Sequence, residues 1–295
     1  MSLAIHPSFE PESCTWSYLL ADTATGEAAI IDPVWVYDAV SGQVDRSFTD
    51  QQLAMLRENG WTLRWILETH AHADHLSAGD LLRQETGATL AIGRGIRDVQ
   101  ANFARVYHTP DVAVDGRQFD RLLEDGDELP LGERTIHVLE TPGHTSDSVT
   151  YRIDDALFIG DTLFEPGFGS ARCDFPGGDA TQLYASIQRL HAFPPDTRLF
   201  LCHDYPAAGD APTAMVTVAD SLANNIHAPA GTTEADYVAL REARDAQLGL
   251  PKLILPAIQV NVLGGAPPDP EANGVSYLKI PFNRTIPSLL SQNDD

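Results

Sequence analysis

The sequence predicts an α/β protein built from stacked layers of strands and helices. Strand-like and helix-like segments alternate along the 295 residues, a pattern typical of α/β layer architectures. A chain of this length buries roughly three quarters of its unfolded surface, which is enough for a full hydrophobic core. The hydrophobic fraction of 43% and the charged fraction of 21% are those of a globular protein and not of a disordered one.

Short apolar runs bounded by turn residues predict the strands. The first two are joined by a turn at Thr25–Gly26, and the third reads as a short buried strand. In chain order, the expected strands are residues 17–21, 28–31, 63–68, 134–139, 148–153, 156–159 and 198–202.

Capping residues and stop signals predict the helices between and after these strands. Thr49 and Gln52 have the spacing of a capping box, and Gly60 and Gly87 stand where helices end. Asp179 is suited to cap a later helix that ends near Pro194. In chain order, the expected helices are residues 49–59, 74–86, 180–194, 213–226 and 234–247.

The C-terminal part of the chain has a different character. Seven prolines after residue 250 make long helices there improbable. The apolar runs at 253–255 and 260–262 indicate an arm that wraps on the protein and not a plain solvated tail. We therefore expect a core at residues 1–210, with helices and a wrapping arm at 211–295 as part of the same domain.

Charge and composition exclude several classes of function. Nineteen Lys and Arg against 42 Asp and Glu give a net charge of −23, which repels phosphate backbones and argues against general nucleic-acid binding. Apolar runs long enough to span a membrane are lacking, and the first residues lack the basic and apolar parts of a secretory signal. Three cysteines without paired spacing fit a reducing cytoplasm best.

Histidines and aspartates gather at the ends of predicted strands. The first group is the run from Thr69 to His75, which reads THAHADH. The others are single residues that directly follow Gly143, Gly160 and Cys202, namely His144, Asp161 and His203. Neutral imidazoles and carboxylates are the usual protein ligands of zinc and iron, and strand ends hold such ligands rigidly. The sequence therefore predicts a metal site.

This motif order, HAHADH followed by GHT, GDT and a late histidine, closely resembles the metallo-β-lactamase superfamily over about residues 15–205. The resemblance implies a four-layer αβ/βα sandwich, with the metal in a cleft at one edge of its two sheets. It also matches Asp32 to the superfamily's early aspartate, which orients the metal-binding loop.

The resemblance leaves two chemistries open. One iron held by His70, His144 and Asp161 would form a triad of two histidines and one carboxylate, with three open positions for substrate and oxygen. His72, Asp74, His75 and His203 would then orient the ligands. Two zinc ions would instead use His70, His72 and His144 for one ion and Asp74, His75 and His203 for the other. Asp161 would bridge the two zinc ions, and a bridging hydroxide would attack an ester carbonyl.

Residues after Asp161 favour the iron enzyme. The stretches at 169–175, 183–184 and 202–205 resemble the persulfide dioxygenases, also called sulfur dioxygenases, which are bacterial relatives of the ethylmalonic encephalopathy protein. That resemblance implies Fe(II), one per chain, and oxygenation of glutathione persulfide by O2 to sulfite and thiol in sulfide detoxification. Glyoxalase II, a zinc hydrolase of glutathione thioesters, has a related loop and stays the alternative, together with a lactonase. The family's usual Gly-Cys-Gly-Arg is Gly169-Ser170-Ala171-Arg172 in this chain.

The expected substrate carries two carboxylates, so this acidic protein needs local cations. The fork of Arg172 suits a carboxylate, and Tyr205 is placed to donate a phenolic hydrogen bond. Both match positions that hold glutathione in the related hydrolase. Lys252 and Lys279 are weaker candidates, and we assign Cys173 no catalytic role. No nucleic acid or membrane partner is expected, and a homodimer is one alternative for the assembly.

Overall fold

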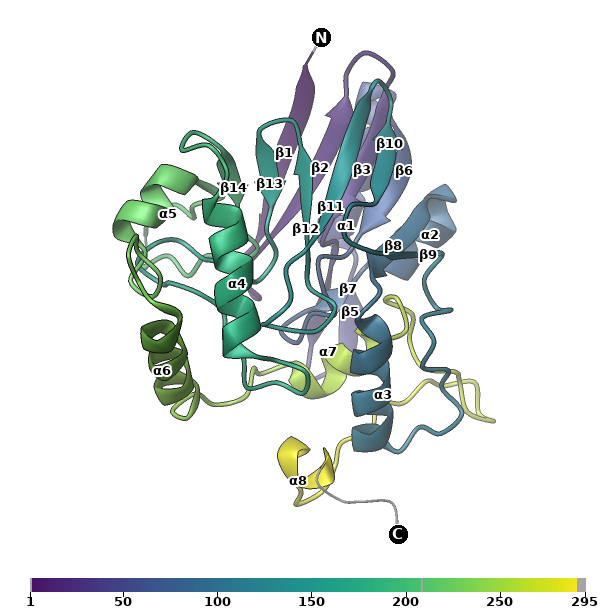
Figure 1. Cartoon of the computed structure of the whole chain (residues 1–295). Coiled ribbons are helices and arrows are strands. Elements are labelled where there is room, and N and C mark those ends of the chain that lie inside the picture. Colours follow the sequence, from purple (N-terminus) through teal and green to yellow (C-terminus); the bar gives the residue numbers. More distant parts are fainter. Residues whose placement is uncertain (1, 208, 291–295) are drawn as a thin grey trace.

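The computed structural model, which describes residues 2–207 and 209–290, contains two large sheets packed face to face (Figure 1). The first sheet has the strand order β1-β2-β3-β6-β8-β9. Its strands are β1 (Leu3–Glu10), β2 (Thr15–Asp22), β3 (Glu27–Ile31), β6 (Thr62–Leu67), β8 (Thr89–Gly93) and β9 (Arg121–Leu123).

The second sheet follows the order β10-β11-β12-β13-β14-β15. Its strands are β10 (Glu128–Leu131), β11 (Arg134–Glu140), β12 (Val149–Ile153), β13 (Ala156–Phe158), β14 (Arg198–Phe200) and β15 (Met215–Thr217). A small third sheet has β4 (Val34–Asp38) between β5 (Gln43–Asp45) and β7 (Leu76–Ser77). All seven predicted strands are present within a few residues of their expected ends.

Helices cover the outer face of each large sheet. The first sheet packs against α1 (Ser47–Asn59), α2 (Gly79–Thr86) and α3 (Ile96–Tyr107). The second packs against α4 (Ala180–His191), α5 (Val218–Asn224) and α6 (Glu234–Asp245). Apolar side chains of both sheets fill the space between them, among them Tyr18, Tyr151 and Phe158. The layers are thus helix, sheet, sheet and helix, which confirms the expected αβ/βα sandwich.

The C-terminal segment runs back along the core. It contains α7 (Ile254–Asn261) and α8 (Ile286–Leu290), joined by extended chain. Ile254, Ile258 and Ile286 join the apolar cluster that includes α3. The segment thus packs on the core with two short helices, and the last residues of the predicted arm, 291–295, lie outside the described residues.

Three predicted helix starts are wrong, and at each of them the structure has a tertiary contact or strand pairing in place of the expected helix start. Thr49 and Gln52 do not form a capping box, since Thr49 donates to the Val34 carbonyl and Gln52 donates to Ser17. The helix expected from Asp74 begins at Gly79, after β7 pairs with β4. The helix expected at 213–226 begins only at Val218, because residues 215–217 pair with β14 as β15.

The stop signals and one cap are as predicted. Gly60 and Gly87 both adopt left-handed backbone after their helices. Asp179 accepts from the backbone N–H of Gln182 at the start of α4. In the described part of the chain, each helix is too short or too polar to cross a membrane.

Candidate metal centre

The first histidine group lies on the loop between β6 and β7. Ile66 and Leu67 are fully buried in the first sheet and fix where this loop begins. The loop has no regular structure from Glu68 to His75, so the directions of its side chains do not follow a helical or strand period. His70, His72 and His75 are each at most 2% exposed.

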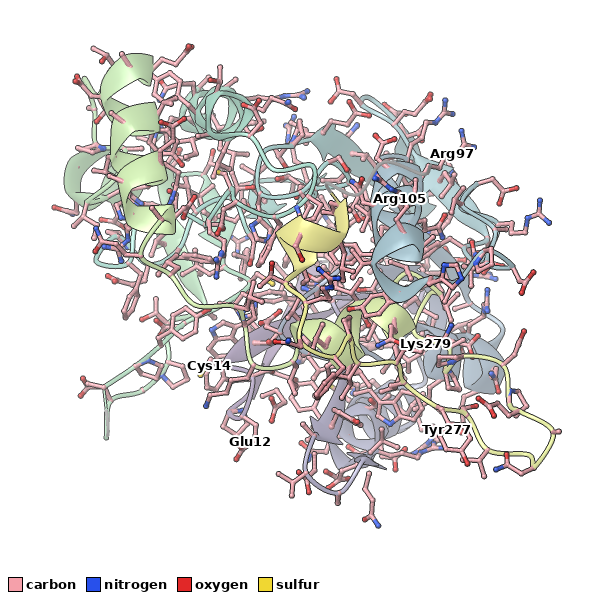
Figure 2. The ribbon with its side chains drawn as sticks, turned by 90° about the horizontal axis from the view of Figure 1, so that it is seen from below. Glu12, Cys14, Arg97, Arg105, Tyr277 and Lys279 are labelled. Atoms are coloured by element: carbon pink, nitrogen blue, oxygen red, sulfur yellow. The ribbon has the colours of Figure 1, made fainter. Side chains whose placement is uncertain are left out.

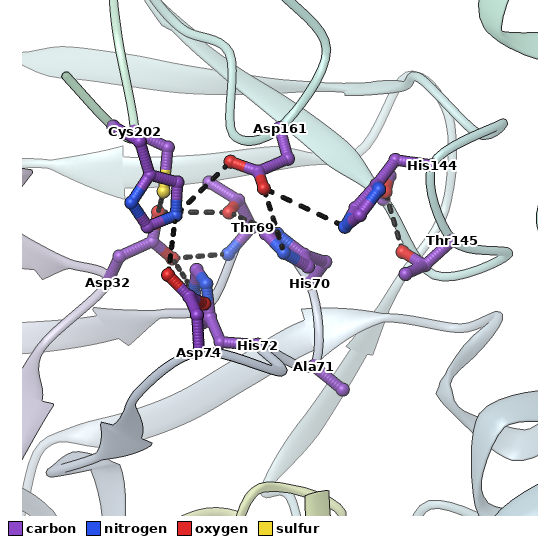
Figure 3. Close-up of polar contacts among 12 residues, drawn as sticks. Asp32, Thr69, His70, Ala71, His72, Asp74, His144, Thr145, Asp161 and Cys202 are labelled. Atoms are coloured by element: carbon purple, nitrogen blue, oxygen red, sulfur yellow. Dashed lines mark hydrogen bonds and ion pairs between the residues drawn. The ribbon is translucent and has the colours of Figure 1, made fainter. Parts of the chain in front are cut away.

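The other predicted ligands come from three loops of the second sheet. β11 and β13 both run antiparallel to β12, and β14 runs parallel to β13. The carboxyl ends of β11, β13 and β14 therefore meet at one edge of the sheet. His144 follows β11, Asp161 follows β13 and His203 follows β14, so the topology brings all three together with the first loop. Figure 3 shows His144 and Asp161 beside His70 of that loop.

Glycines next to two of these side chains are required by the backbone. Gly143 has a φ of +134°, and a Cβ there would lie 2.2 Å from the backbone nitrogen of Leu183. Gly160 has a φ of +51°, and a Cβ there would lie 2.8 Å from the Thr69 side chain. Both positions need glycine for conformation and for space.

His70, His144 and Asp161 form one compact set. Asp161 Oδ2 lies 3.7 Å from His144 Nε2 and 4.0 Å from His70 Nε2. One potential ligand atom from each of the three residues lies within 4.8 Å of the other two. This is the triad that the sequence predicts for a single metal ion.

A second set adjoins the first. His72, Asp74 and His75 each offer a ligand atom within 4.8 Å of the other two. His203 Nε2 lies 3.1 Å from Asp74 Oδ2 and 3.4 Å from Asp161 Oδ1. Asp161 thus has one oxygen toward each set, and the structure brings all seven predicted residues together.

Buried polar atoms without partners show that these residues fit a metal ion. Within the described chain, the following atoms are buried and make no hydrogen bond: His70 Nε2, His72 Nδ1, His75 Nε2, His203 Nε2 and Asp161 Oδ1. A buried polar atom without a partner is destabilising by about 1–3 kcal/mol. A bound cation would satisfy these atoms together, and the clusters therefore form a metal-binding site.

Burial sets the protonation that such a site requires. Burial, together with the neighbouring imidazoles, lowers the pKa of His70 and His72 well below the usual histidine value. Both imidazoles are therefore neutral and have a free lone pair for a metal. Burial raises the pKa of Asp161, which a nearby cation would oppose.

Contacts on the opposite ring nitrogens orient the imidazoles. His144 Nδ1 donates to the carbonyl of Arg172 at 2.7 Å, and His70 Nδ1 lies 3.0 Å from Thr69 Oγ1. Both contacts leave Nε2 directed toward Asp161 (Figure 3). His72 differs, because its Nε2 lies 3.0 Å from Asp32 Oδ1 and its Nδ1 is the atom without a partner.

Asp32 is tied to the metal-binding loop by hydrogen bonds. Its carboxylate accepts from the backbone N–H of Thr69 at 2.7 Å and from the Thr69 hydroxyl at 2.9 Å. Burial raises the pKa of Asp32 to about 6. Its place matches the orienting role that the family resemblance implies for this residue.

Sequence reasoning missed three residues at this site. Asp147 accepts from the backbone N–H of Ala71 at 2.8 Å. The buried Glu68 has an oxygen 3.7 Å from His72 Nε2, and Asn261 of α7 donates to the carbonyls of His72 and His75. Asp147 stands three residues after His144, so the GHT motif could have led to it. Glu68 and Asn261 carry no such signal.

A cavity of about 980 Å³ opens beside the metal site. His144, Asp161, Arg172 and Tyr205 all line it. The ring of Tyr205 stacks on His203 with an interplanar angle of 13°. The cavity is large enough for a tripeptide-sized ligand.

The guanidinium of Arg172 is already engaged. Nε and Nη2 donate to the two oxygens of Asp174 at 2.6 and 2.7 Å, and Nη1 donates to the Gly249 carbonyl at 2.6 Å. A substrate carboxylate would have to share or replace these contacts. The substrate role of Arg172 stays a prediction.

The two lysines lie in different places. Lys252 lines the cavity together with Cys14 and Glu12. Lys279 instead donates to the His108 carbonyl at 3.0 Å, and in Figure 2 it lies apart from Cys14 and Glu12. Lys252 is therefore the better placed of the two for a substrate in this cavity.

Comparison with known proteins identifies the family. The sequence profile of the metallo-beta-lactamase superfamily matches residues 14–203. The chain belongs to this superfamily. This chain is similar to the crystal structure of ETHE1 from Myxococcus xanthus, with 31% sequence identity and a TM-score of 0.72. The match covers 89% of this chain and 100% of the Myxococcus xanthus chain.

Relatives within the superfamily have diverging names. A probable metallo-hydrolase of Burkholderia pseudomallei is 49% identical over 95% of this chain and 99% of its own length. The human mitochondrial persulfide dioxygenase ETHE1 is 33% identical over 69% of each chain. A hydroxyacylglutathione hydrolase of Methylococcus capsulatus is 35% identical over 65% of this chain and 62% of its own. The chain spans 64% of the length of beta-lactamase hydrolase-like proteins from Agrobacterium fabrum and Xylella fastidiosa.

Proposed function

We propose that this chain is an iron-dependent persulfide dioxygenase that acts on glutathione persulfide or a similar small persulfide. The main observation behind this proposal is that one ligand atom each of His70, His144 and Asp161 lie within 4.8 Å of one another. His72 does not belong to this group and lies with other residues. Two histidines and one carboxylate with open positions are typical of non-haem Fe(II) oxygenases. The 31% identity to ETHE1 over 89% of this chain supports the proposal.

The overall reaction balances with one oxygen molecule and one water. The S–S bond of the persulfide breaks, and its terminal sulfur receives two oxygen atoms from O2 and one from water. The products are the thiol, sulfite and two protons. When bound, Fe(II) supplies the oxygen chemistry.

The chain's own residues orient the reactants and keep the ligands in the correct form. Burial keeps His70 neutral, and the Arg172 carbonyl fixes the ring of His144 by accepting from Nδ1. The cavity reaches both His144 and Asp161, so a ligand in it has access to the metal. Arg172 and Tyr205 hold the peptide part of the substrate in this proposal.

The alternative is a two-zinc hydrolase of a glutathione thioester or lactone. The observation that favours it is the position of Asp161, with Oδ2 3.7 Å from His144 and Oδ1 3.4 Å from His203. A carboxylate between two ligand sets is suited to bridge two metal ions. The 35% identity to a hydroxyacylglutathione hydrolase supports this alternative.

Metal content and oxygen uptake separate the two reactions. We expect protein purified without oxygen to hold one iron per chain and to consume O2 in step with sulfite release from glutathione persulfide. Lactoylglutathione should be hydrolysed slowly. Elemental analysis, an oxygen electrode and a sulfite assay measure these quantities. Two zinc ions per chain with fast thioester hydrolysis and no oxygen uptake would replace the proposal by the hydrolase.

A further inference from the structure

Asn261 links the C-terminal arm to the loop that carries the histidines. It is the last residue of α7 and is 3% exposed. Its side-chain amide donates to the His72 carbonyl at 2.7 Å and to the His75 carbonyl at 2.8 Å, and its oxygen accepts from the Ser77 N–H at 2.8 Å. One side chain therefore satisfies two backbone carbonyls of the metal-binding loop and one backbone N–H of β7.

The packing around Asn261 makes this contact rigid. Ala257 and Val260 of α7 form an apolar cluster with Leu76 of β7. After α7 the chain turns at Gly265, where a Cβ would lie 2.7 Å from the Ser77 carbonyl. A side chain at position 265 would therefore collide with residue 77, and the arm packs directly against residues 75–77.

We propose that Asn261 is a positioning residue of the metal site, which fixes the backbone of residues 72–77 and thereby the directions of His72, Asp74 and His75. Only an amide of this length provides two donors and one acceptor in this arrangement. The inference concerns the loop itself, so it holds for the dioxygenase and for the hydrolase alike.

Metal affinity is the readout that separates this role from general stability. Partners that orient metal ligands change metal affinity by about 10–100-fold when removed. We expect Asn261→Ala to bind Zn²⁺ weaker by about this factor in chelator competition. The Co²⁺ absorption spectrum of the variant should change as well, because the ligand geometry changes.

Asp22 offers a control away from the metal-binding loop. It is 1% exposed and also takes part in three hydrogen bonds, which it accepts from the Ala24 N–H, the Thr25 hydroxyl and the Glu133 N–H. None of these partners belongs to the metal-binding loop or to the C-terminal arm. Asp22→Ala should lower the Tm of the metal-free protein, with little change in Zn²⁺ affinity. Equal Zn²⁺ affinity in the two variants would overturn the proposal.

Two further measurements test the proposal even if Asn261→Ala does not fold. Asn261→Asp keeps the size and the acceptor but faces two carbonyl oxygens with a carboxylate, so it should also lose Zn²⁺ affinity. In the wild-type chain, Zn²⁺ should slow hydrogen exchange at residues 70–77 and at 254–265 together, because Asn261 couples these segments. Protection of 70–77 alone would contradict the coupling.

Discussion

The imidazoles of His70 and His144 are held differently from the imidazole of His72. Nδ1 of His144 donates to a carbonyl and Nδ1 of His70 faces a hydroxyl, so Nε2 of each is left for a metal. His72 uses Nε2 toward Asp32 and has Nδ1 without a partner. The nitrogen left without a partner is therefore Nε2 in His70 but Nδ1 in His72. This difference predicts that single substitutions of the histidines have different effects on metal binding.

Replacing each histidine by alanine should distinguish a ligand from an orienting residue. We expect His144→Ala to lose bound iron and activity, because the triad with His70 and Asp161 is broken. His72→Ala should retain iron with an affinity lower by about 10–100-fold. Iron content after anaerobic purification and the rate of oxygen uptake measure both effects. A His144→Ala protein with full iron, or a metal-free His72→Ala protein with intact folding, would reverse the assignment.

Spacing in the sequence explains which site residues could be predicted. The four ligand-type side chains between His70 and His75 stand close together, and His144, Asp161 and His203 each follow a predicted strand. Asn261 could not be found in this way, because it lies 184 residues from Ser77, whose N–H it accepts. Glu68 was hidden because it reads as the end of an apolar strand.

At the scale of elements, α6 holds the loop that supports His144. Arg241 donates to the carbonyl of Ser170 at 3.0 Å and pairs with Asp245 at 2.7 Å, while Asp245 accepts from the Cys173 N–H at 2.9 Å. Arg241 is 2% exposed. The loop between Ser170 and Cys173 includes Arg172, whose carbonyl accepts from His144. The helix thus acts on the metal site through backbone contacts.

Breaking the buried pair of α6 should destabilise the protein strongly. Arg241→Met leaves Asp245 buried without its partner, a change that lowers the free energy of unfolding by about 3–5 kcal/mol. Adding Asp245→Leu should recover part of that loss, because no unpaired charge remains. Arg244→Met on the exposed side of the same helix is the control and should change stability by less than about 0.5 kcal/mol. Urea denaturation measures all three, and equal stability of Arg241→Met and Arg244→Met would contradict the argument.

Element boundaries show where local sequence signals are insufficient. Gly60 and Gly87 end their helices as predicted, because a left-handed residue is a local requirement. The start of α2 could not be read from Asp74, because residues 76–77 pair with β4 and Asn261 binds the loop before them. The start of α5 has a local signal that was overlooked. Thr217 and Asp220 form the capping box there.

At the scale of the whole molecule, the layered core and the acidic surface have opposite effects on stability. The two sheets and their helices bury three large apolar clusters, which favours the folded state. The net charge of −23 favours expansion, because like charges are closer together in the compact chain than in the unfolded one. The layers were predictable from alternating segments, whereas the path of the arm depends on contacts that no local pattern encodes.

Salt should therefore stabilise this protein by screening its own charge. Raising the ionic strength from about 0.01 M to about 0.1 M shortens the Debye length from about 30 Å to about 10 Å. We expect the Tm at about pH 8 to rise, and a gain of about 1 kcal/mol corresponds to roughly 2–4 °C for a large domain. The same salt series at about pH 5.5, closer to the sequence pI of 4.6, should give a smaller rise because less net charge remains to be screened. Calorimetry at both pH values checks this, with sucrose as an uncharged control. An equal rise at both pH values would mean that the charge of −23 is not what limits stability.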